Sequence, residues 1–236
     1  MVLGDSKKGR LGLPFFMGVF MQSNINIGMH FAVPIVRVSY PSPEALNRDL
    51  RDMFLAWEKD GVYKTLQPVP TNQVNIYESE WALLDREEPQ IRSLRKFIMH
   101  SLLHSVAKLN NLDQTASLKL KPNIHSWVHL TSNGGYVSQH NHPNASWSGI
   151  YFVDPGESLA ESKDSGLVKF ATPNPAIKMH RDAGNCSLQG PLSHNTLVIQ
   201  PKAGDLVIFP SYLMHEVSPY VGSGRRITIA FNCWFT

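Results

Sequence analysis

The sequence predicts a mainly β protein, a sandwich or barrel of short strands, with helices in its amino-terminal half. From Lys121 onward, short runs rich in β-branched and aromatic residues alternate with stretches rich in Gly, Pro, Asn and Asp, which is typical of all-β domains. Charged residues make up 17% of the chain, below the usual quarter. The 236 residues suffice for one such domain.

The predicted strands begin with residues 31–40 (FAVPIVRVSY), where Pro34 favours an edge position or a late strand start. Gly134-Gly135 is expected to form a turn between the first two of the later strands. These later strands are 123–130, 136–140, 148–153, 166–170, 196–199, 206–209 and 227–234.

Two helices are predicted between the first strand and the others. The first has Ser42 as its cap and Pro43 in its first turn, and it ends at Gly61. The second begins near Pro89 and carries an apolar stripe at helical spacing from Ile91 to Leu109. We expect both helices to cover one face of a sheet.

Charge and cysteine content narrow the class of protein. The net charge of +3 comes from 22 basic and 19 acidic residues, and the absence of a basic stripe in the sequence argues against nucleic-acid binding. Cys186 and Cys233 allow one disulfide, but reduced thiols in a cytoplasmic protein are the simpler interpretation. No apolar run in the sequence reaches the length of a membrane span.

Residues 1–30 are predicted to be an extension outside a single domain of residues 31–236, whose core covers about 123–236. The basic residues 7–10 and the apolar run 11–21 resemble a signal peptide. Pro14 interrupts that run, and so few cysteines fit a secreted protein poorly. We therefore prefer an extension, or a true start at Met21 or Met29.

Three places in the sequence suggest chemistry. Residues i and i+2 of a strand point the same way, so His140 and His142 can present two imidazoles to one metal ion such as iron, zinc, copper or nickel. His215 follows a predicted strand that stops at Pro210, and it is expected at a strand rim. Arg225-Arg226 precedes the apolar strand ITIAFN, and a buried arginine needs an anionic partner, either a small dicarboxylate or an acidic side chain.

The stretches HNHP, SWSGIYFV, SGLVKF, GDLVIFPSYLMHEVSP and RRITIAFN resemble the iron(II)- and 2-oxoglutarate-dependent oxygenases. Within them, the resemblance is strongest to a group of small, mostly uncharacterised oxygenases with a His-x-His first motif. It covers about residues 123–236, and GDLVIFP, HEVSP and the later arginine are its most specific part. The resemblance implies a double-stranded β-helix, a cupin-like jelly roll, with iron(II) at one end and 2-oxoglutarate as cosubstrate.

The resemblance also implies roles for individual residues. His140 becomes the first metal ligand and His215 the distal one, and Arg226 or Arg225 binds the far carboxylate of 2-oxoglutarate. Arg226 is preferred because it directly precedes the final strand, and only one of the two can point inward. Tyr136 and Asn232 are further candidates for hydrogen bonds to 2-oxoglutarate.

His142 stands where most of the superfamily has Asp or Glu, so we predict a three-histidine site. Three histidines are also compatible with other functions. These are a zinc-dependent hydrolase or hydratase, a cupin-type metalloenzyme without cosubstrate, and a non-catalytic binding module. The arginine favours the oxygenase, because a hydrolytic zinc site does not need it. The expected reaction is hydroxylation of a small molecule or a peptide.

One strand face ahead of the motif carries His125, Trp127 and His129. These side chains either line the cavity or have a structural role, and we prefer the structural role.

Overall fold

The computed structural model describes residues 27–66, 71–159, 161–174 and 180–236. The chain divides into two units, with the boundary between Phe31 and Ala32. The signal-like run 7–21 and the alternative start at Met21 lie outside the described residues. The predicted boundary between extension and domain therefore stays a prediction.

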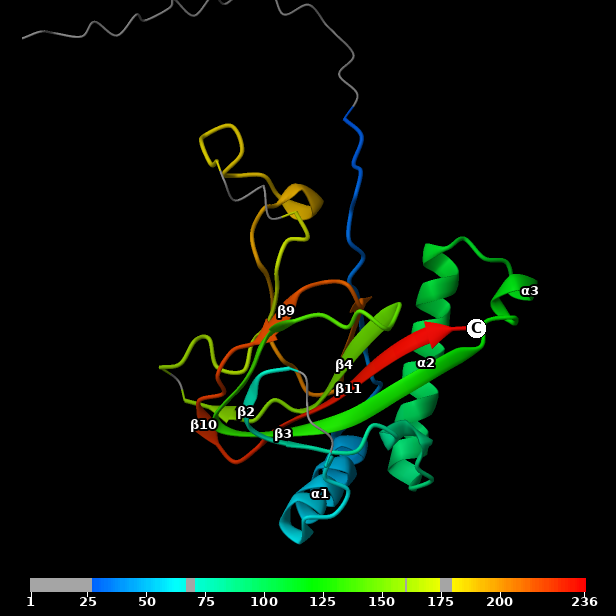
Figure 1. Ribbon diagram of the computed structural model, residues 1–236, viewed down its shortest axis with the longest axis vertical. Helices are drawn as coiled ribbons and strands as arrows, with labels where there is room; N and C mark the ends of the chain where they lie inside the picture. Colours follow the sequence, from blue (N-terminus) through cyan, green and yellow to red (C-terminus); the bar gives the residue numbers. More distant parts are fainter. Residues whose placement is uncertain (1–26, 67–70, 160, 175–179) are drawn as a thin grey trace, which may run out of the picture. The chain divides into compact units, whose positions relative to one another are not determined.

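The second unit has more strand than helix, with two long helices near its beginning (Figure 1). The helices are α1 (Glu44–Asp60), α2 (Pro89–Leu109) and α3 (Gln114–Ser117), with short 3-10 turns at Leu83–Asp85 and Gly190–Leu192. The strands are β1 (Val36–Ser39), β2 (Gln73–Glu78), β3 (Pro122–His140), β4 (Trp147–Asp154), β5 (Glu157–Ser158), β6 (Val168–Phe170), β7 (Leu197–Ile199), β8 (Asp205–Pro210), β9 (His215–Val217), β10 (Gly222–Ser223) and β11 (Arg226–Phe235).

The main sheet has the order β1-β8-β4-β11-β3-β9-β6-β7, with β2 also paired to β3 and every pair antiparallel. The first half of β3 pairs with β11, whereas its second half pairs with β9. The sheet therefore curls around β3 into a half-barrel. This mainly antiparallel, curled sheet confirms the predicted jelly-roll class.

The two long helices cover one face of the sheet, as predicted (Figure 1). Pro89 is the first residue of α2, and Gly61 ends α1 in a left-handed conformation at φ 67°. The apolar stripe of α2 packs against side chains that alternate along the strands. This core includes Leu50, Phe54, Ile91, Leu94, Ile98, Leu102, Val128, Leu130, Tyr151 and Ile229.

A second apolar cluster lies inside the curl of the sheet. Side chains of β4 and β8, such as Phe152 and Phe209, meet Val168 and Phe170 from β6 there. The cluster holds the β9-β6-β7 part of the sheet over the β4-β8 part, so the half-barrel has an apolar interior.

Two local predictions were wrong. Gly134-Gly135 does not end a strand: β3 continues through it, and the register with β2 shifts opposite Asn75, whose φ is 52°. Glycine at φ 76° allows this bulge without reversing the chain. Ser42 does not cap α1, because the cap position is Pro43 and no side chain bonds to the first turn.

No helix of the described residues is both long and apolar enough to cross a membrane.

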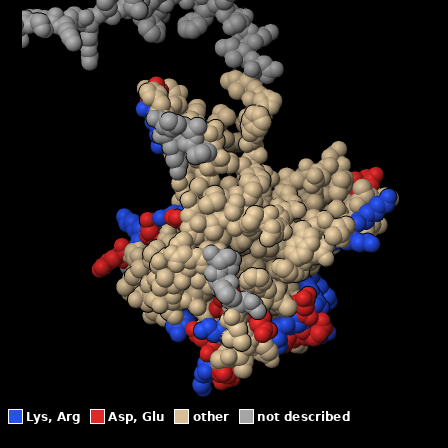
Figure 2. Space-filling model, viewed as in Figure 1, with Lys and Arg blue, Asp and Glu red and all other residues tan. Residues whose placement is uncertain are grey.

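On the face shown in Figure 2, basic and acidic side chains are interspersed. Cys186 is an exposed free thiol and Cys233 a buried one.

Candidate metal centre

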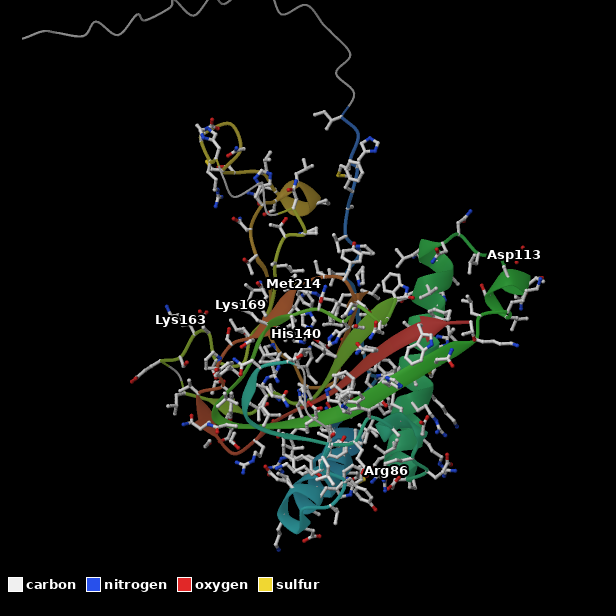
Figure 3. The ribbon with its side chains drawn as sticks, viewed as in Figure 1. Arg86, Asp113, His140, Lys163, Lys169 and Met214 are labelled. Atoms are coloured by element: carbon white, nitrogen blue, oxygen red, sulfur yellow. The ribbon has the colours of Figure 1, made fainter. Side chains whose placement is uncertain are left out.

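Three histidines meet where β3 and β9 run side by side. His140 is the last residue of β3, His215 is the first of β9, and the two are direct partners in the sheet register. His142 follows β3 by two residues, and its backbone N–H donates to the Ser211 carbonyl at 2.9 Å. The three potential ligand atoms lie within 4.8 Å of one another. Figure 3 shows His140 in the interior between these strands.

Hydrogen bonds fix which ring nitrogen faces the shared point. His140 Nδ1 donates to the Ser138 carbonyl at 2.8 Å, and His215 Nδ1 donates to the Leu213 carbonyl at 2.9 Å. A carbonyl only accepts, so in both neutral rings Nε2 keeps its lone pair for a metal. The ring centroids lie 4.3 Å (His140 to His215), 4.9 Å (His140 to His142) and 5.2 Å (His142 to His215) apart.

The electrostatic setting keeps these imidazoles neutral. Burial lowers the pKa of all three, and the neighbouring imidazoles add repulsion, which brings the pKa of His142 to about 4 and that of His215 to about 3. Metal ions bind only the neutral form. The cluster is therefore ready to bind a cation throughout the physiological pH range.

These lowered pKa values predict a pH-dependent stability of the metal-free protein. Between pH 6.5 and the folded pKa values, the unfolded chain binds more protons, so the free energy of unfolding falls as the pH drops. A buried histidine contributes about 1.4 kcal/mol per pH unit in this window. Urea unfolding of chelator-treated protein at pH 7 and pH 5 should show this loss, and His215→Gln should show a smaller one. Equal losses in both proteins would contradict the assigned pKa of His215.

Arg226 places an incompletely satisfied guanidinium in the same cavity. Arg226 is only 2% exposed. Its Nε donates a hydrogen bond to the Gly166 carbonyl at 3.1 Å, and its Nη1 lies 3.5 Å from Thr228 Oγ1. Nη2 is buried and has no hydrogen-bond partner among the described residues. Burial lowers the pKa of Arg226 to about 10, so the group stays charged at neutral pH. A buried charge of this kind is costly without an anion beside it.

The other candidates for cosubstrate binding lie elsewhere. Arg225 forms an ion pair with Glu58 of α1 at 2.9 Å and does not line the cavity. The Asn232 side chain accepts a hydrogen bond from Ser148 at 2.7 Å. Tyr136 is half-buried on β3 and is not part of the cavity wall. Of the four residues, only Arg226 shares a cavity with the three histidines.

This cavity lies inside the half-barrel and encloses about 460 Å³, open solvent at its mouth included. Trp127 and His129 belong to its wall, whereas the sequence favoured a structural role for both. The lining consists of Trp127, His129, Val137, His140, His142, Ser148, Gly149, Ile150, Phe209, His215, Val217, Arg226, Thr228, Ala230 and Phe231.

Gly166 supports the arginine with a conformation that other residues rarely adopt. Its φ is 61°, and an added Cβ would lie 2.9 Å from Arg226 Cδ. Gly166→Ala should destabilise the protein by about 1–2 kcal/mol, and it should weaken binding of the predicted cosubstrate, 2-oxoglutarate, by displacing the guanidinium. Gly190→Ala is the matched control, because Gly190 has φ 56° and nothing within 4 Å of its added Cβ. Calorimetric titration and thermal unfolding of both variants separate displacement from backbone strain, and equal cosubstrate affinity in both would contradict the displacement.

Comparison with known proteins finds one family model that resembles part of the chain. The family model described as "Putative 2OG-Fe(II) oxygenase" matches residues 125–232. The match contains the three clustered histidines and Arg226. No curated protein matches the sequence.

Several solved structures share the fold. A prolyl hydroxylase from Trichoplax adhaerens, in complex with a peptide fragment of hypoxia inducible factor, has a TM-score of 0.54 at 13% identity, over 85% of this chain and 82% of that one. The carbocyclase SnoK from nogalamycin biosynthesis has a TM-score of 0.54 at 11% identity, over 85% and 79%. HygX from Streptomyces hygroscopicus, with nickel, 2-oxoglutarate and hygromycin B bound, has a TM-score of 0.51 at 9% identity, over 86% and 83%.

Proposed function

We propose that the chain is a dioxygenase of the 2OG-Fe(II) oxygenase family that hydroxylates a small molecule or a peptide, since the family model matches residues 125–232. One observation carries this proposal: three neutral imidazoles and a buried guanidinium with a free N–H line the same cavity. A metal site without cosubstrate, including a hydrolytic zinc site, gives that guanidinium no partner.

In this proposal His140, His142 and His215 hold the iron(II) ion, and Arg226 pairs with the far carboxylate of 2-oxoglutarate. Iron and 2-oxoglutarate together supply the means to activate dioxygen for attack on a C–H bond. Nη2 of Arg226 offers the unsatisfied donor that a carboxylate oxygen would accept. Thr228, whose hydroxyl lies beside Nη1, can donate a further hydrogen bond to the same carboxylate.

The protein environment adds two effects. Three neutral imidazoles leave the charge of a divalent ion uncompensated, so an anionic cosubstrate is held more strongly than beside a carboxylate ligand. Apolar side chains such as Val137, Val217 and Ile150 line the cavity. They exclude water and thereby strengthen the electrostatic interactions within it.

The substrate class is proposed more broadly. The similar structures include a prolyl hydroxylase bound to a peptide fragment and HygX bound to hygromycin B, so both peptides and small molecules are candidates. We also propose a cytoplasmic location, with which the free thiols of Cys186 and Cys233 are consistent.

Metal analysis combined with a succinate assay tests the proposal. The purified protein should bind iron(II) and convert 2-oxoglutarate to succinate under air. Bound zinc without 2-oxoglutarate turnover would instead support the hydrolytic enzyme, and failure to bind any metal would support a binding module. Each outcome therefore selects one of the three classes.

A further inference from the structure

Four aromatic side chains form a continuous row that starts at the histidine cluster, and we call this row the aromatic wall. Trp127 lines the cavity, and its ring lies 6.2 Å, between centroids, from the ring of His142. Trp81 lies 6.4 Å from Trp127, and His125 lies 6.2 Å from Trp81. Trp234 completes the row at 4.8 Å from His125. A ligand with one end at the metal centre can therefore extend along these rings.

The aromatic wall is assembled from three separate segments of the chain. His125 and Trp127 lie two residues apart on β3, so their side chains share a face of the sheet. Trp234 belongs to β11, which pairs with this part of β3. Trp81 lies in the turn after β2, and its backbone carbonyl accepts a hydrogen bond from the Ser126 N–H at 2.9 Å. Only the folded chain brings these rings together.

Hydrogen bonds within the protein occupy the polar edges of the two indoles nearest the cavity. Trp81 Nε1 donates to Oε1 of Glu78 at 3.1 Å, and Trp127 Nε1 donates to Nε2 of His129 at 3.0 Å. Glu78 is 4% exposed, so the polar edge of Trp81 is turned toward the protein interior. The orientation of both rings is therefore fixed before any ligand binds, which lowers the entropic cost of binding.

The aromatic wall leaves much of its ring surface uncovered. Trp81 is 39% exposed, His125 is exposed, and Trp127 and Trp234 are half-buried. Among the residues that the structure describes, the guanidinium groups found over aromatic rings lie over other rings than these four. Connected apolar surface of this kind is typical of a binding site. Because the wall starts at the metal centre, its ligand is expected to be the substrate.

The chemistry of the wall favours a flat aromatic ring as this ligand. The ring of Trp81 is inclined by 47° to that of Trp127 and by 32° to that of His125. A flat ring can thus stack on one of them and meet the next with its edge, and both arrangements are preferred by aromatic pairs. A sugar ring fits less well, because its hydroxyl groups need hydrogen-bond partners and the two indole N–H groups are already occupied.

We propose that the aromatic wall binds an aromatic ring of the substrate, which stacks on Trp81 and Trp127 beside the metal centre. The ring serves as an anchor, and a neighbouring part of the same molecule reaches the three histidines. An aromatic residue of a peptide and a small aromatic molecule both supply such a ring. The inference rests on the proposed function, because it is the metal centre beside the wall that makes a bound molecule a substrate.

The test uses protein loaded with Zn(II) and 2-oxoglutarate, which is diamagnetic and needs no turnover. Benzamide and cyclohexanecarboxamide are matched probes, because one carries an aromatic six-membered ring and the other a saturated one. Methyl glucoside is the sugar probe. Nitrogen-15 NMR follows the indole signals, which the variants Trp81→Leu and Trp127→Leu assign. We expect saturable shifts of the Trp81 and Trp127 signals, with benzamide bound about 2- to 10-fold more tightly than cyclohexanecarboxamide.

A fourth probe, N-acetylphenylalaninamide, distinguishes the two sources of the ring. It carries an aromatic ring on a peptide backbone. Tighter binding of this probe than of benzamide would support the inference with a peptide substrate. Tighter binding of benzamide would support it with a small aromatic molecule.

Variants show whether Trp81 is responsible for the preference for an aromatic ring. Trp81→Leu keeps an apolar side chain but removes the ring, so benzamide should lose its advantage over cyclohexanecarboxamide. Trp81→Phe keeps a ring and should retain most of that advantage. Tyr63→Leu is the matched control, because Tyr63 is 41% exposed but contacts Trp57 and Arg86 instead. Its affinity for benzamide should stay unchanged.

Several results would overturn the inference. These are the absence of a saturable shift with both aromatic probes, equal affinity for benzamide and cyclohexanecarboxamide, tighter binding of methyl glucoside than of benzamide, and an unchanged preference in Trp81→Leu. Loss of benzamide binding in Tyr63→Leu would likewise place the probe away from the aromatic wall.

The outcome is independent of the test of the proposed function. Succinate formation is measured on iron-loaded protein, whereas the probe titration needs only a filled metal site. Turnover without a preference for the aromatic probe would overturn the role of the wall alone. A preference that depends on Trp81 without turnover would support the wall and overturn the dioxygenase.

Discussion

Replacing Arg226 with Ala should lower the affinity for 2-oxoglutarate by roughly 30-fold to several thousand-fold, while metal affinity stays within a few-fold. The guanidinium is buried, and its Nη2 donor has no partner among the described residues. The far carboxylate of 2-oxoglutarate would remain buried without a counter-charge in the variant. Truncating one partner of a buried charge pair costs about 2–5 kcal/mol, which gives the stated range.

Calorimetric titration of 2-oxoglutarate into the Zn(II)-loaded protein measures this effect without turnover. Arg225→Ala is the matched control, because the neighbouring Arg225 pairs with Glu58 instead, and its cosubstrate affinity should be unchanged. Arg226→Lys should recover part of the loss, since lysine keeps the charge but not the planar fork. Equal weakening of metal and 2-oxoglutarate by Arg226→Ala would contradict the assigned role.

Replacing His215 with Ala should lower iron(II) and zinc(II) affinity by more than about 100-fold. Mutation of a residue that only hydrogen-bonds to a metal ligand already lowers metal affinity about 10- to 100-fold. His215 itself supplies one of the three converging nitrogens, so its loss should cost more. The effect should appear in competition with a coloured chelator. His100→Ala is the control, because His100 lies exposed on α2. Unchanged metal affinity in His215→Ala would contradict the proposal that His215 is a metal ligand.

His142→Asp probes the charge of the same centre. A carboxylate can still bind the ion but compensates part of its charge, so the metal should be retained while 2-oxoglutarate binds more weakly. The compensated iron(II) should also oxidise more readily in air, which absorbance spectroscopy can follow. Equal cosubstrate affinity and oxidation rate in the two proteins would contradict the electrostatic role of a three-histidine site.

Local sequence determined much of the fold. The signals that bound the two long helices are local in the sequence. These are the apolar spacing of α2, Pro89 at its start, and Gly61 after α1. Each can be recognised without the rest of the chain. The strands β4, β8 and β11 were predicted within one or two residues of their bounds, because their apolar runs are buried and bounded by turn residues. The short strands β2 and β9 were missed, since they form by pairing with distant segments: β2 pairs with β3, and β9 pairs with β3 and β6.

The sequence, together with its family resemblance, also singled out His140, His142, His215 and Arg226, because their motifs are local and their residue types carry the chemistry. Only the tertiary structure decided that β9 lies against the end of β3, that Arg225 pairs with Glu58, and that Glu78 of β2 lies beside His129. These are contacts between segments distant in the chain. Strand register and burial set them, and neither can be read from the residues of one segment alone.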